Sequence, residues 1–285
     1  MPSSVLITGV NSGIGLVTAV ELAAAGWDVI GTTRDEEKAD RVHAAAAERG
    51  VELRTVRCDV DDAASCADAV AQAEKLTGGL HALVNNAGYV QAGAVEDISD
   101  AQVRAQLETN VVAPIRLARL VLPAMRERGD GRIVNVSSVA GRLTTPLMGW
   151  YAASKHALEA VTDALRMEVE PDGITVSLVE PGMFATQIWS VADASFPEPT
   201  TPRYAAAYAR GQAMSARSQR LPDPVWVART IRLALSNPVP LARYVIGADA
   251  AGGILAERIL PTAVTDYVKA ITTGLRSPVR LPFLR

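Results

Sequence analysis

The stretch Val5-Leu6-Ile7-Thr8-Gly9-Val10-Asn11-Ser12-Gly13-Ile14-Gly15, close to the start of the chain, decides the fold. Its aliphatic residues predict a strand over Val5–Thr8, and its glycines predict a tight turn into a helix over Ile14–Ala25. Because glycine has no side chain, the backbone N–H groups of such a turn can approach a pyrophosphate closely, and the positive end of the helix attracts its negative charge. The spacing is GxxxGxG rather than GxGxxG, and no GK[ST] follows, so a triphosphate P-loop is excluded. The stretch predicts either a nucleotide site or a plain turn of an α/β fold.

The rest of the chain repeats this alternation of short strands and longer helices. Strands are expected over Trp27–Thr33, Val51–Cys58, Leu80–Asn85, Gly131–Ser137, Ile174–Val179 and Arg243–Ile246, and helices over residues 35–49, 63–75, 99–128 and 150–170. Such alternation implies parallel strands joined by right-handed crossovers. We therefore predict an α/β fold: one Rossmann-type domain over residues 1–285, with a doubly wound, seven-stranded parallel sheet and helices on both faces.

Composition and charge exclude several classes of protein. Of 285 residues, 49% are apolar and 21% charged, which is typical of a globular protein and excludes a disordered chain. The net charge of −3 provides no basic field for nucleic acid. Two cysteines and three scattered histidines indicate a reducing compartment and no metal site. No signal peptide precedes Val5 and no transmembrane stretch is predicted, so the expected location is cytoplasmic.

Polar side chains stand where strands end and where the next helix begins. Tyr151 and Lys155 are four residues apart on a predicted helix, so both project from one face. A free tyrosine has a pKa of about 10, and an adjacent ammonium favours its ionised form. Lowering that pKa by about three units requires about 4 kcal/mol of differential stabilisation. Ser138, or its neighbour Ser137, could donate a hydrogen bond to a substrate oxygen.

Together with Asn85-Asn86-Ala87-Gly88 and Pro181-Gly182, these motifs resemble the short-chain dehydrogenase/reductase family, in its compact single-domain branch, from about Val5 to Thr186. The resemblance implies a catalytic tetrad of Asn110, Ser138, Tyr151 and Lys155. Its spacing of 13 residues to the tyrosine selects Ser138 over Ser137, and it has Asn110 holding a water in a proton relay with Lys155. Tyr151 is then the general acid in reduction and the base in oxidation.

Each of these features has a plainer explanation when taken alone. Tyr151 and Lys155 could lie on a solvated helix face, Asp59 could cap the following helix, and Asn85-Asn86 could form a turn. Their joint occurrence at strand ends favours catalysis.

The cofactor is predicted from the end of the second strand, Gly31-Thr32-Thr33-Arg34. A carboxylate at this place binds the ribose of NAD, whereas an arginine binds the 2′-phosphate of NADP. Arg34 follows the strand, and Asp35 is interpreted as a helix cap, so NADP(H) is predicted over NAD(H). Ser12 departs from the basic residue that many NADP-dependent members carry in the glycine motif. The predicted cofactor-binding residues are Gly9, Asn11, Ser12, Gly13, Ile14, Gly15, Thr33, Arg34, Asp59, Val60, Asn86, Ala87, Gly88, Tyr151, Lys155, Pro181, Gly182 and Thr186.

The substrate is predicted to be a lipophilic carbonyl compound or alcohol. Expected pocket walls are almost all apolar: Leu143, Pro146, Leu147, Met148, Trp150, Met183, Phe184, Ile188 and Trp189. The sequence around the tyrosine and around Pro181-Gly182 is similar to the retinol and 17β-hydroxysteroid dehydrogenase branch. Residues 187–240 are predicted to cover the substrate. Two alternatives remain: a 3-oxoacyl-thioester reductase of the same family, or a non-catalytic NADP(H)-binding sensor.

The C-terminal part carries an amphipathic stretch, Ile254–Leu275. It predicts a helix that packs on the sheet or on a subunit partner, or that lies on a membrane surface. The basic tail Leu275–Arg285 could touch a partner or an anionic surface. The resemblance implies a homodimer or homotetramer.

Overall fold

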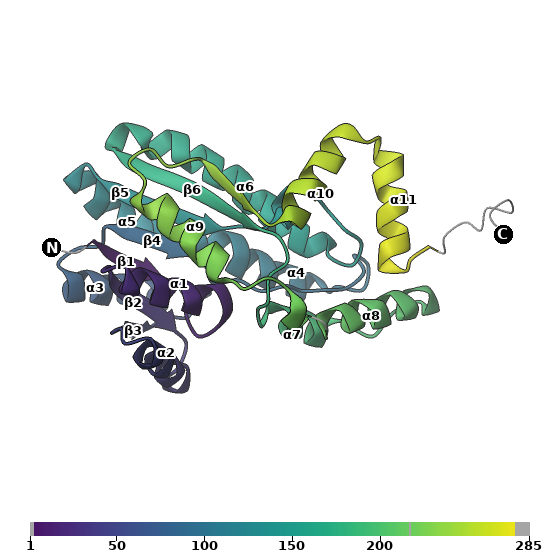
Figure 1. Cartoon of the computed structure of the whole chain (residues 1–285), viewed down its shortest axis with the longest axis horizontal. Helices are drawn as coiled ribbons and strands as arrows, with labels where there is room; N and C mark the ends of the chain where they lie inside the picture. The colour runs from purple at the N-terminus through teal and green to yellow at the C-terminus, as the bar shows by residue number, and fades with distance from the viewer. Residues whose placement is uncertain (1–2, 217, 277–285) are drawn as a thin grey trace, which may run out of the picture.

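Seven strands form one sheet in the order β3-β2-β1-β4-β5-β6-β7, and every neighbouring pair is parallel (Figure 1). The structure is a computed structural model that describes residues 3–276 except residue 217. The strands are β1 (Ser4–Ile7), β2 (Asp28–Thr33), β3 (Arg54–Arg57), β4 (Ala82–Asn85), β5 (Gly131–Val136), β6 (Ile174–Pro181) and β7 (Arg243–Ile246). The predicted seven-stranded parallel sheet is confirmed.

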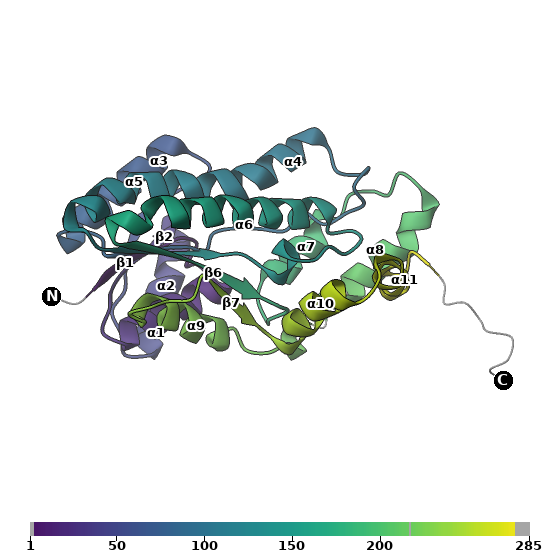
Figure 2. The ribbon, with the colours of Figure 1, turned by 90° about the horizontal axis from the view of Figure 1, so that it is seen from above.

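Helices cover both faces of the sheet. They are α1 (Gly13–Ala24), α2 (Glu36–Glu48), α3 (Ala63–Thr77), α4 (Asp100–Leu107), α5 (Ala113–Arg128), α6 (Gly149–Val169), α7 (Ile188–Ser195), α8 (Pro202–Ser215), α9 (Val225–Ser236), α10 (Ala248–Ile259) and α11 (Thr262–Thr273). Figure 2 shows α3, α5 and α6 along one face and α1, α2 and α9 along the other. This is the doubly wound arrangement that the alternation predicts.

Alternate side chains of each strand enter two separate cores. In β1, Val5 and Ile7 pack with α1, α2 and α9, whereas Leu6 packs with α3 and α5. Residues on both faces are apolar because a parallel sheet is buried on both sides. β1 lies between β2 and β4, so the chain reverses its direction across the sheet at the carboxyl end of β1. A crevice opens at such a switch point, and ligands bind there.

The predicted helix over residues 99–128 is wrong in one respect, because it is interrupted. Ser99 starts α4 with a capping box to Gln102, a π-helical turn spans Glu108–Val112, and α5 follows. Periodicity alone does not reveal the extra residue that such a turn inserts. π-turns are rare and occur often at functional sites.

Four helices beyond β6, which are α7, α8, α10 and α11, form a separate wall at the carboxyl edge of the sheet. α10 and α11 are two helices rather than the single stretch expected over Ile254–Leu275, because Leu260 and Pro261 are extended. α11 contacts α8, and α10 contacts β7 (Figure 1). Within the range 187–240, α7 and α8 belong to this wall, whereas α9, which the sequence analysis missed, packs on α1 and the sheet.

Among the described residues, no helix is both long and apolar enough to cross a membrane. Residues 277–285 of the basic tail lie outside the described residues, whereas Leu275 packs beside Ala207 and Tyr208, and Arg276 lies over the ring of Tyr267.

Candidate active site

One cavity of about 1030 Å³ runs along the carboxyl edge of the sheet and contains nearly all the residues predicted for the site. Its lining includes the glycine turn, the end of β2, the segment after β4, the predicted catalytic residues Ser138, Tyr151 and Lys155, and Pro181, Gly182 and Thr186. Of the predicted site residues, Gly15 and Asn110 do not line it. Gly15 lies under the turn, and Asn110 lies behind the segment that follows β4.

The glycine turn has the shape that a dinucleotide pyrophosphate requires. Gly9 and Gly13 have φ angles of +69° and +55°, a region that favours glycine. α1 begins at Gly13, and its N-cap Ser12 makes no side-chain capping bond. The first N–H groups of a helix have no partner within that helix, so those of α1 can point at an anion. A Cβ on Gly15 would lie 2.3 Å from the carbonyl oxygen of Gly9, so only glycine permits this close turn.

Thr8 and Asn86 hold the turn in place. The Thr8 hydroxyl accepts hydrogen bonds from the backbone nitrogens of Asn86 (3.0 Å) and Ala87 (2.9 Å). The Asn86 side chain donates to the carbonyl oxygens of Thr8 (2.9 Å) and Gly9 (3.2 Å). Asn86 therefore ties the end of β4 to the turn after β1. Thr8 belongs to the quoted motif, but its role at the site was missed because the two segments are far apart in sequence.

At the end of β2, Arg34 is exposed and lines the cavity. Asp35 caps α2 by accepting a hydrogen bond from the backbone nitrogen of Lys38 (3.0 Å), as its helix-cap interpretation requires. That bond and the Lys38 ammonium lower the pKa of the Asp35 carboxyl. Asp59 also lines the cavity, whereas Asp62 caps α3, so the alternative that Asp59 caps that helix is excluded.

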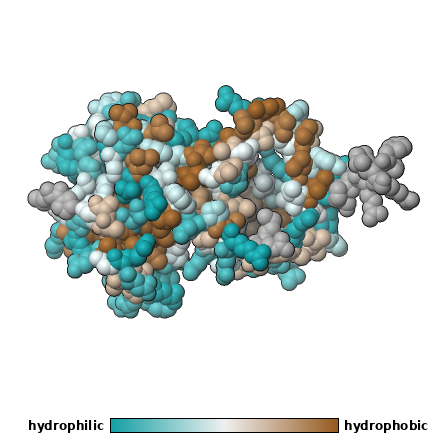
Figure 3. Space-filling view, viewed as in Figure 1, coloured by the Kyte–Doolittle hydropathy of each residue, from teal (hydrophilic) through white to brown (hydrophobic). Residues whose placement is uncertain are grey.

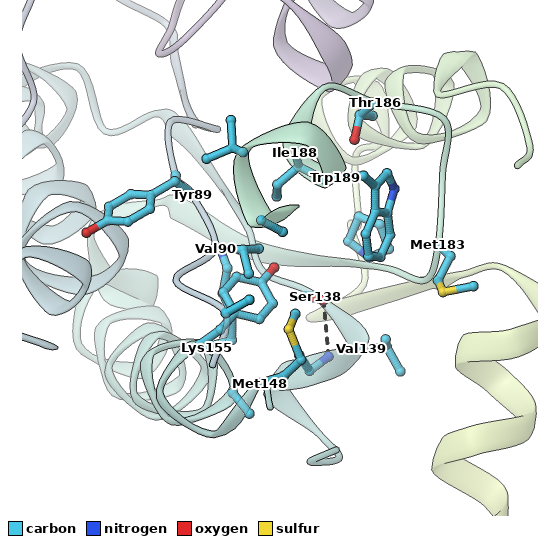
Figure 4. A pocket seen from close by; sticks show the side chains of 18 of the residues that line it. Tyr89, Val90, Ser138, Val139, Met148, Lys155, Met183, Thr186, Ile188 and Trp189 are labelled. Carbon is cyan, nitrogen blue, oxygen red and sulfur yellow. Dashed lines mark hydrogen bonds between the residues drawn. The ribbon is translucent and has the colours of Figure 1, made fainter. Parts of the chain in front are cut away.

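Tyr151, Ser138 and Lys155 meet at the middle of the cavity. Ser138 follows β5, and its Oγ accepts a hydrogen bond from the Ala140 nitrogen at 3.1 Å (Figure 4). Lys155 Nζ donates to the carbonyl oxygen of Val136 (2.9 Å) and lies 6.0 Å from the centre of the Tyr151 ring. Because Ser138 Oγ acts as an acceptor here, its own proton remains able to donate to a ligand.

Burial sets the protonation of these groups. It raises the pKa of Tyr151, which the Ser138 hydroxyl opposes, so the phenol is protonated at neutral pH. Burial also lowers the pKa of Lys155 to about 8, although the Glu159 carboxylate opposes this shift. In the protein alone, Tyr151 therefore holds the proton that a general acid must give.

Asn110 lies in the π-helical turn and is buried. Its Nδ2 donates to the carbonyl oxygen of Tyr89 (3.0 Å) and to Ser154 Oγ (3.0 Å), and its Oδ1 accepts from the Tyr89 nitrogen (3.1 Å). A Cβ on Gly88 would lie 3.1 Å from Asn110 Oδ1 and 3.8 Å from Lys155 Nζ. The side chains of Asn110 and Lys155 therefore both lie next to Gly88.

The other half of the cavity is largely apolar. Of the predicted wall residues, all but Trp150 line it, and Figure 4 shows Met148, Met183, Ile188 and Trp189 among the side chains of the lining. Leu147 has a φ of +68°, a strained conformation for a branched side chain, and strain of this kind is common at functional sites.

The far wall of the cavity was not predicted from the sequence. It consists of residues from α8, α10 and α11: Ala207, Arg210, Gly211, Asp249, Gly253, Ala256, Glu257, Leu260, Thr265, Val268, Lys269, Thr272 and Thr273. The amphipathicity of Ile254–Leu275 was the available signal, because the inner face of that stretch lines the cavity. Exposed apolar residues of the α10–α11 pair that do not line the cavity are Leu255, Ile259 and Val264, and apolar surface gathers over this pair in Figure 3.

Comparisons with solved structures agree with this geometry. The chain superposes on a short-chain dehydrogenase of Streptomyces avermitilis with a TM-score of 0.81 and 34% identity, covering 96% of this chain and 98% of the other. It is also similar to actinorhodin polyketide ketoreductase with NADPH (TM-score 0.74, 30% identity, 87% and 97% covered). A Burkholderia phymatum short-chain dehydrogenase/reductase in complex with NAD matches with a TM-score of 0.79 at 27% identity, covering 94% and 95%.

Sequence comparisons identify the family. Over 271 residues, 94% of each chain, the protein is 36% identical to the uncharacterized oxidoreductase YbbO of Escherichia coli (strain K12). It is 38% identical to human retinol dehydrogenase 8 over 216 residues, which is 71% of this chain and 68% of the relative. The family model for short chain dehydrogenases matches residues 3–195. The chain belongs to the short-chain dehydrogenase/reductase family and, like its named relatives, is an oxidoreductase.

Proposed function

We propose that the protein is an NADP(H)-dependent oxidoreductase that interconverts an alcohol with a ketone or aldehyde on a lipophilic small molecule. One observation carries the proposal: Tyr151, Ser138 and Lys155 lie in the same cavity as the glycine turn, with an apolar wall opposite. When bound, a nicotinamide cofactor supplies or accepts the hydride. The side chains of the protein bind the reactants and move the proton.

Tyr151 carries the proton in this scheme. Its phenol is protonated at neutral pH, so it can protonate a substrate oxygen during reduction and, once ionised, take a proton from an alcohol. Ser138 orients the same oxygen and stabilises negative charge there. Lys155 places an ammonium beside the phenol, where it favours the ionised form. Asn110 holds the segment Gly88-Tyr89 and, through it, the surroundings of Lys155.

Arg34 supports the choice of NADP(H). It lines the end of the cavity next to Thr33, and the nearest carboxylate, Asp35, is engaged by Lys38. A guanidinium can bind a 2′-phosphate with two parallel hydrogen bonds. Similar structures contain NADPH in one case and NAD in another, so the preference rests on Arg34. Asp59 and Val60 would flank the adenine.

The apolar wall supports a lipophilic substrate. Met148, Met183, Ile188 and Trp189 line the cavity that holds Tyr151 and Ser138, and α8, α10 and α11 contribute its far wall. We assign α7 and α8 the substrate-covering role, since α9 packs against the sheet. Retinol dehydrogenase 8 is named for a lipophilic alcohol, in line with this assignment.

Turnover of NADPH with a panel of lipophilic ketones and aldehydes tests the proposal. Tyr151→Phe removes the phenolic proton and should lower kcat by at least about 100-fold, with the Kd for NADPH changed little. Tyr89→Phe is the matched control, because Tyr89 also lines the cavity but points away from Tyr151 and Ser138 (Figure 4); it should keep nearly full activity. Equal activity of the wild type and Tyr151→Phe would refute the role of Tyr151, and binding of NADPH without turnover of any compound would favour a sensor.

A further inference from the structure

A buried charged cluster lies one helical turn beyond Lys155. Glu159 follows Lys155 by four residues on α6, so the two side chains share the helix face that also carries Tyr151. Glu159 and, from β6, Glu180 are both buried, with 5% and 0% of their surfaces exposed. Carboxylates are rarely buried this deeply unless they are paired.

Two arginines from separate elements face these carboxylates. Arg243 of β7 donates from Nε to Glu159 Oε2 at 3.0 Å and lies 3.1 Å from Glu180 Oε1. Arg142, which follows β5, donates from Nη1 to Glu180 Oε1 at 3.4 Å. Arg243 also pairs with Asp163, the next carboxylate along α6. The remaining charged groups around the cluster are Arg166, which pairs with Asp163, and Asp249 of α10, which accepts a hydrogen bond from the Met183 nitrogen.

Several oxygen atoms in and beside this charged cluster have no hydrogen-bond partner in the part of the chain that the structure describes. Glu159 Oε1, Glu180 Oε2 and Ser137 Oγ are buried and have no hydrogen-bond partner among the described residues. A Cβ on Gly141 would lie 2.9 Å from Ser137 Oγ and 3.2 Å from Glu159 Oε1, so these two atoms converge on one glycine beside Ser138. Leaving such atoms unpaired costs free energy, which a purely structural ion pair would avoid.

We propose that Glu159 is a positioning residue: held by Arg243, its carboxylate keeps the buried Lys155 ammonium charged, so that Lys155 can stabilise the Tyr151 phenolate. The idea rests on the proposed function of Tyr151. Glu180 Oε1 faces both Arg142 and Arg243, which compensate its charge, whereas Glu159 pairs with Arg243 and lies one turn from Lys155 on the same helix. Glu159 is then the carboxylate that acts on Lys155, and its effect opposes the shift that burial imposes on that lysine.

The test is the pH profile of alcohol oxidation. kcat/KM should rise with pH as Tyr151 ionises, and Glu159→Gln should move this rise to higher pH by about one to two units. That magnitude follows from loss of the Lys155 charge, because Lys155 Nζ lies 6.0 Å from the centre of the Tyr151 ring and the effective dielectric constant is about 20. Glu159→Asp, which keeps a charge, should restore much of the wild-type profile. Asp163→Asn is the matched control: it removes another carboxylate from Arg243, one turn further from Lys155, and should leave the profile unmoved.

The outcomes separate this proposal from the one it rests on. A folded Glu159→Gln enzyme with a wild-type profile overturns the role of Glu159, as does an equal shift in Asp163→Asn. A wild-type profile that does not rise with pH, or a rise that persists in Tyr151→Phe, counts instead against Tyr151. If Glu159→Gln does not fold, Glu159→Gln combined with Arg243→Gln removes the buried charges together and should shift the profile in the same direction.

Discussion

Gly15→Ala is a direct test of the glycine turn, because the new methyl group has no room. Its Cβ would lie 2.3 Å from the Gly9 carbonyl oxygen and 2.4 Å from Asn86 Nδ2, where ordinary contact begins at 3.4 Å. The turn or the Asn86 side chain must therefore retreat by about 1 Å, far enough to break the hydrogen bonds from Asn86 to Thr8 and Gly9.

The magnitude follows from those contacts. Each of the two lost hydrogen bonds costs about 0.5–1.5 kcal/mol net and overpacking costs about 1–3 kcal/mol, so we expect a loss of about 2–6 kcal/mol in the free energy of unfolding. The protein should remain folded, with its Tm lowered by about 5–15 °C. Because the same movement displaces the N–H groups that would bind pyrophosphate, the Kd for NADPH should rise by at least about 100-fold.

Fluorescence titration with NADPH and thermal unfolding measure the two effects. Gly26→Ala, just beyond the other end of α1, is the matched control: its φ is +86°, but nothing lies within 4 Å of its Cβ position. It should cost only the conformational strain of about 1–2 kcal/mol and leave the Kd unchanged. If Gly15→Ala binds NADPH as tightly as Gly26→Ala does, this explanation of the turn is wrong.

Three further predictions concern other parts of the molecule. Arg34→Asp should raise the Kd for NADPH by at least about 10-fold and leave that for NADH nearly unchanged; equal loss for both cofactors contradicts the phosphate role. Tyr208→Phe removes the hydroxyl that accepts a hydrogen bond from the Ala94 nitrogen and donates to Asp97, so calorimetry should show a loss of about 1–3 kcal/mol. Glu180 has a folded-state pKa of about 7, above its ordinary value of 4.5. Protonated Glu180 therefore stabilises the fold fully below pH 4.5, and this stabilisation is lost as pH rises through 7. Urea unfolding should show the free energy of unfolding falling by up to about 3 kcal/mol between pH 4 and 8, and this fall should be absent in Glu180→Gln.

The grouping of the predicted cofactor-binding residues in one cavity could be predicted because these residues follow strand ends. In a parallel sheet, all carboxyl ends meet at one edge, so Gly9, Arg34, Asn86, Ser138 and Pro181 are brought together by topology alone. No long-range contact had to be known to place them there. Helical spacing then placed Tyr151 and Lys155 on one face for the same reason.

The Glu159–Arg243 pair and the π-helical turn could not be predicted, because local sequence patterns carry no information about contacts between distant residues. Glu159 and Arg243 are 84 residues apart in the chain. From the sequence alone, nothing distinguishes Glu159 from the other polar residues of its helix. The π-helical turn at Asn110 leaves no trace in the hydrophobic periodicity of residues 99–128, although asparagine inside a helix is a hint that some special geometry is present.

The substrate is harder to infer from the sequence than the cofactor, because the cavity wall depends on contacts between distant parts of the chain. The family model matches residues 3–195, whereas much of the far cavity wall comes from α8, α10 and α11, after residue 195. Those helices lie beyond the sheet edge, so their placement depends on packing against one another, as with Lys269 of α11 paired to Glu257 of α10. We therefore expect substrate selection to depend largely on helices that lie outside the residues matched by the family model.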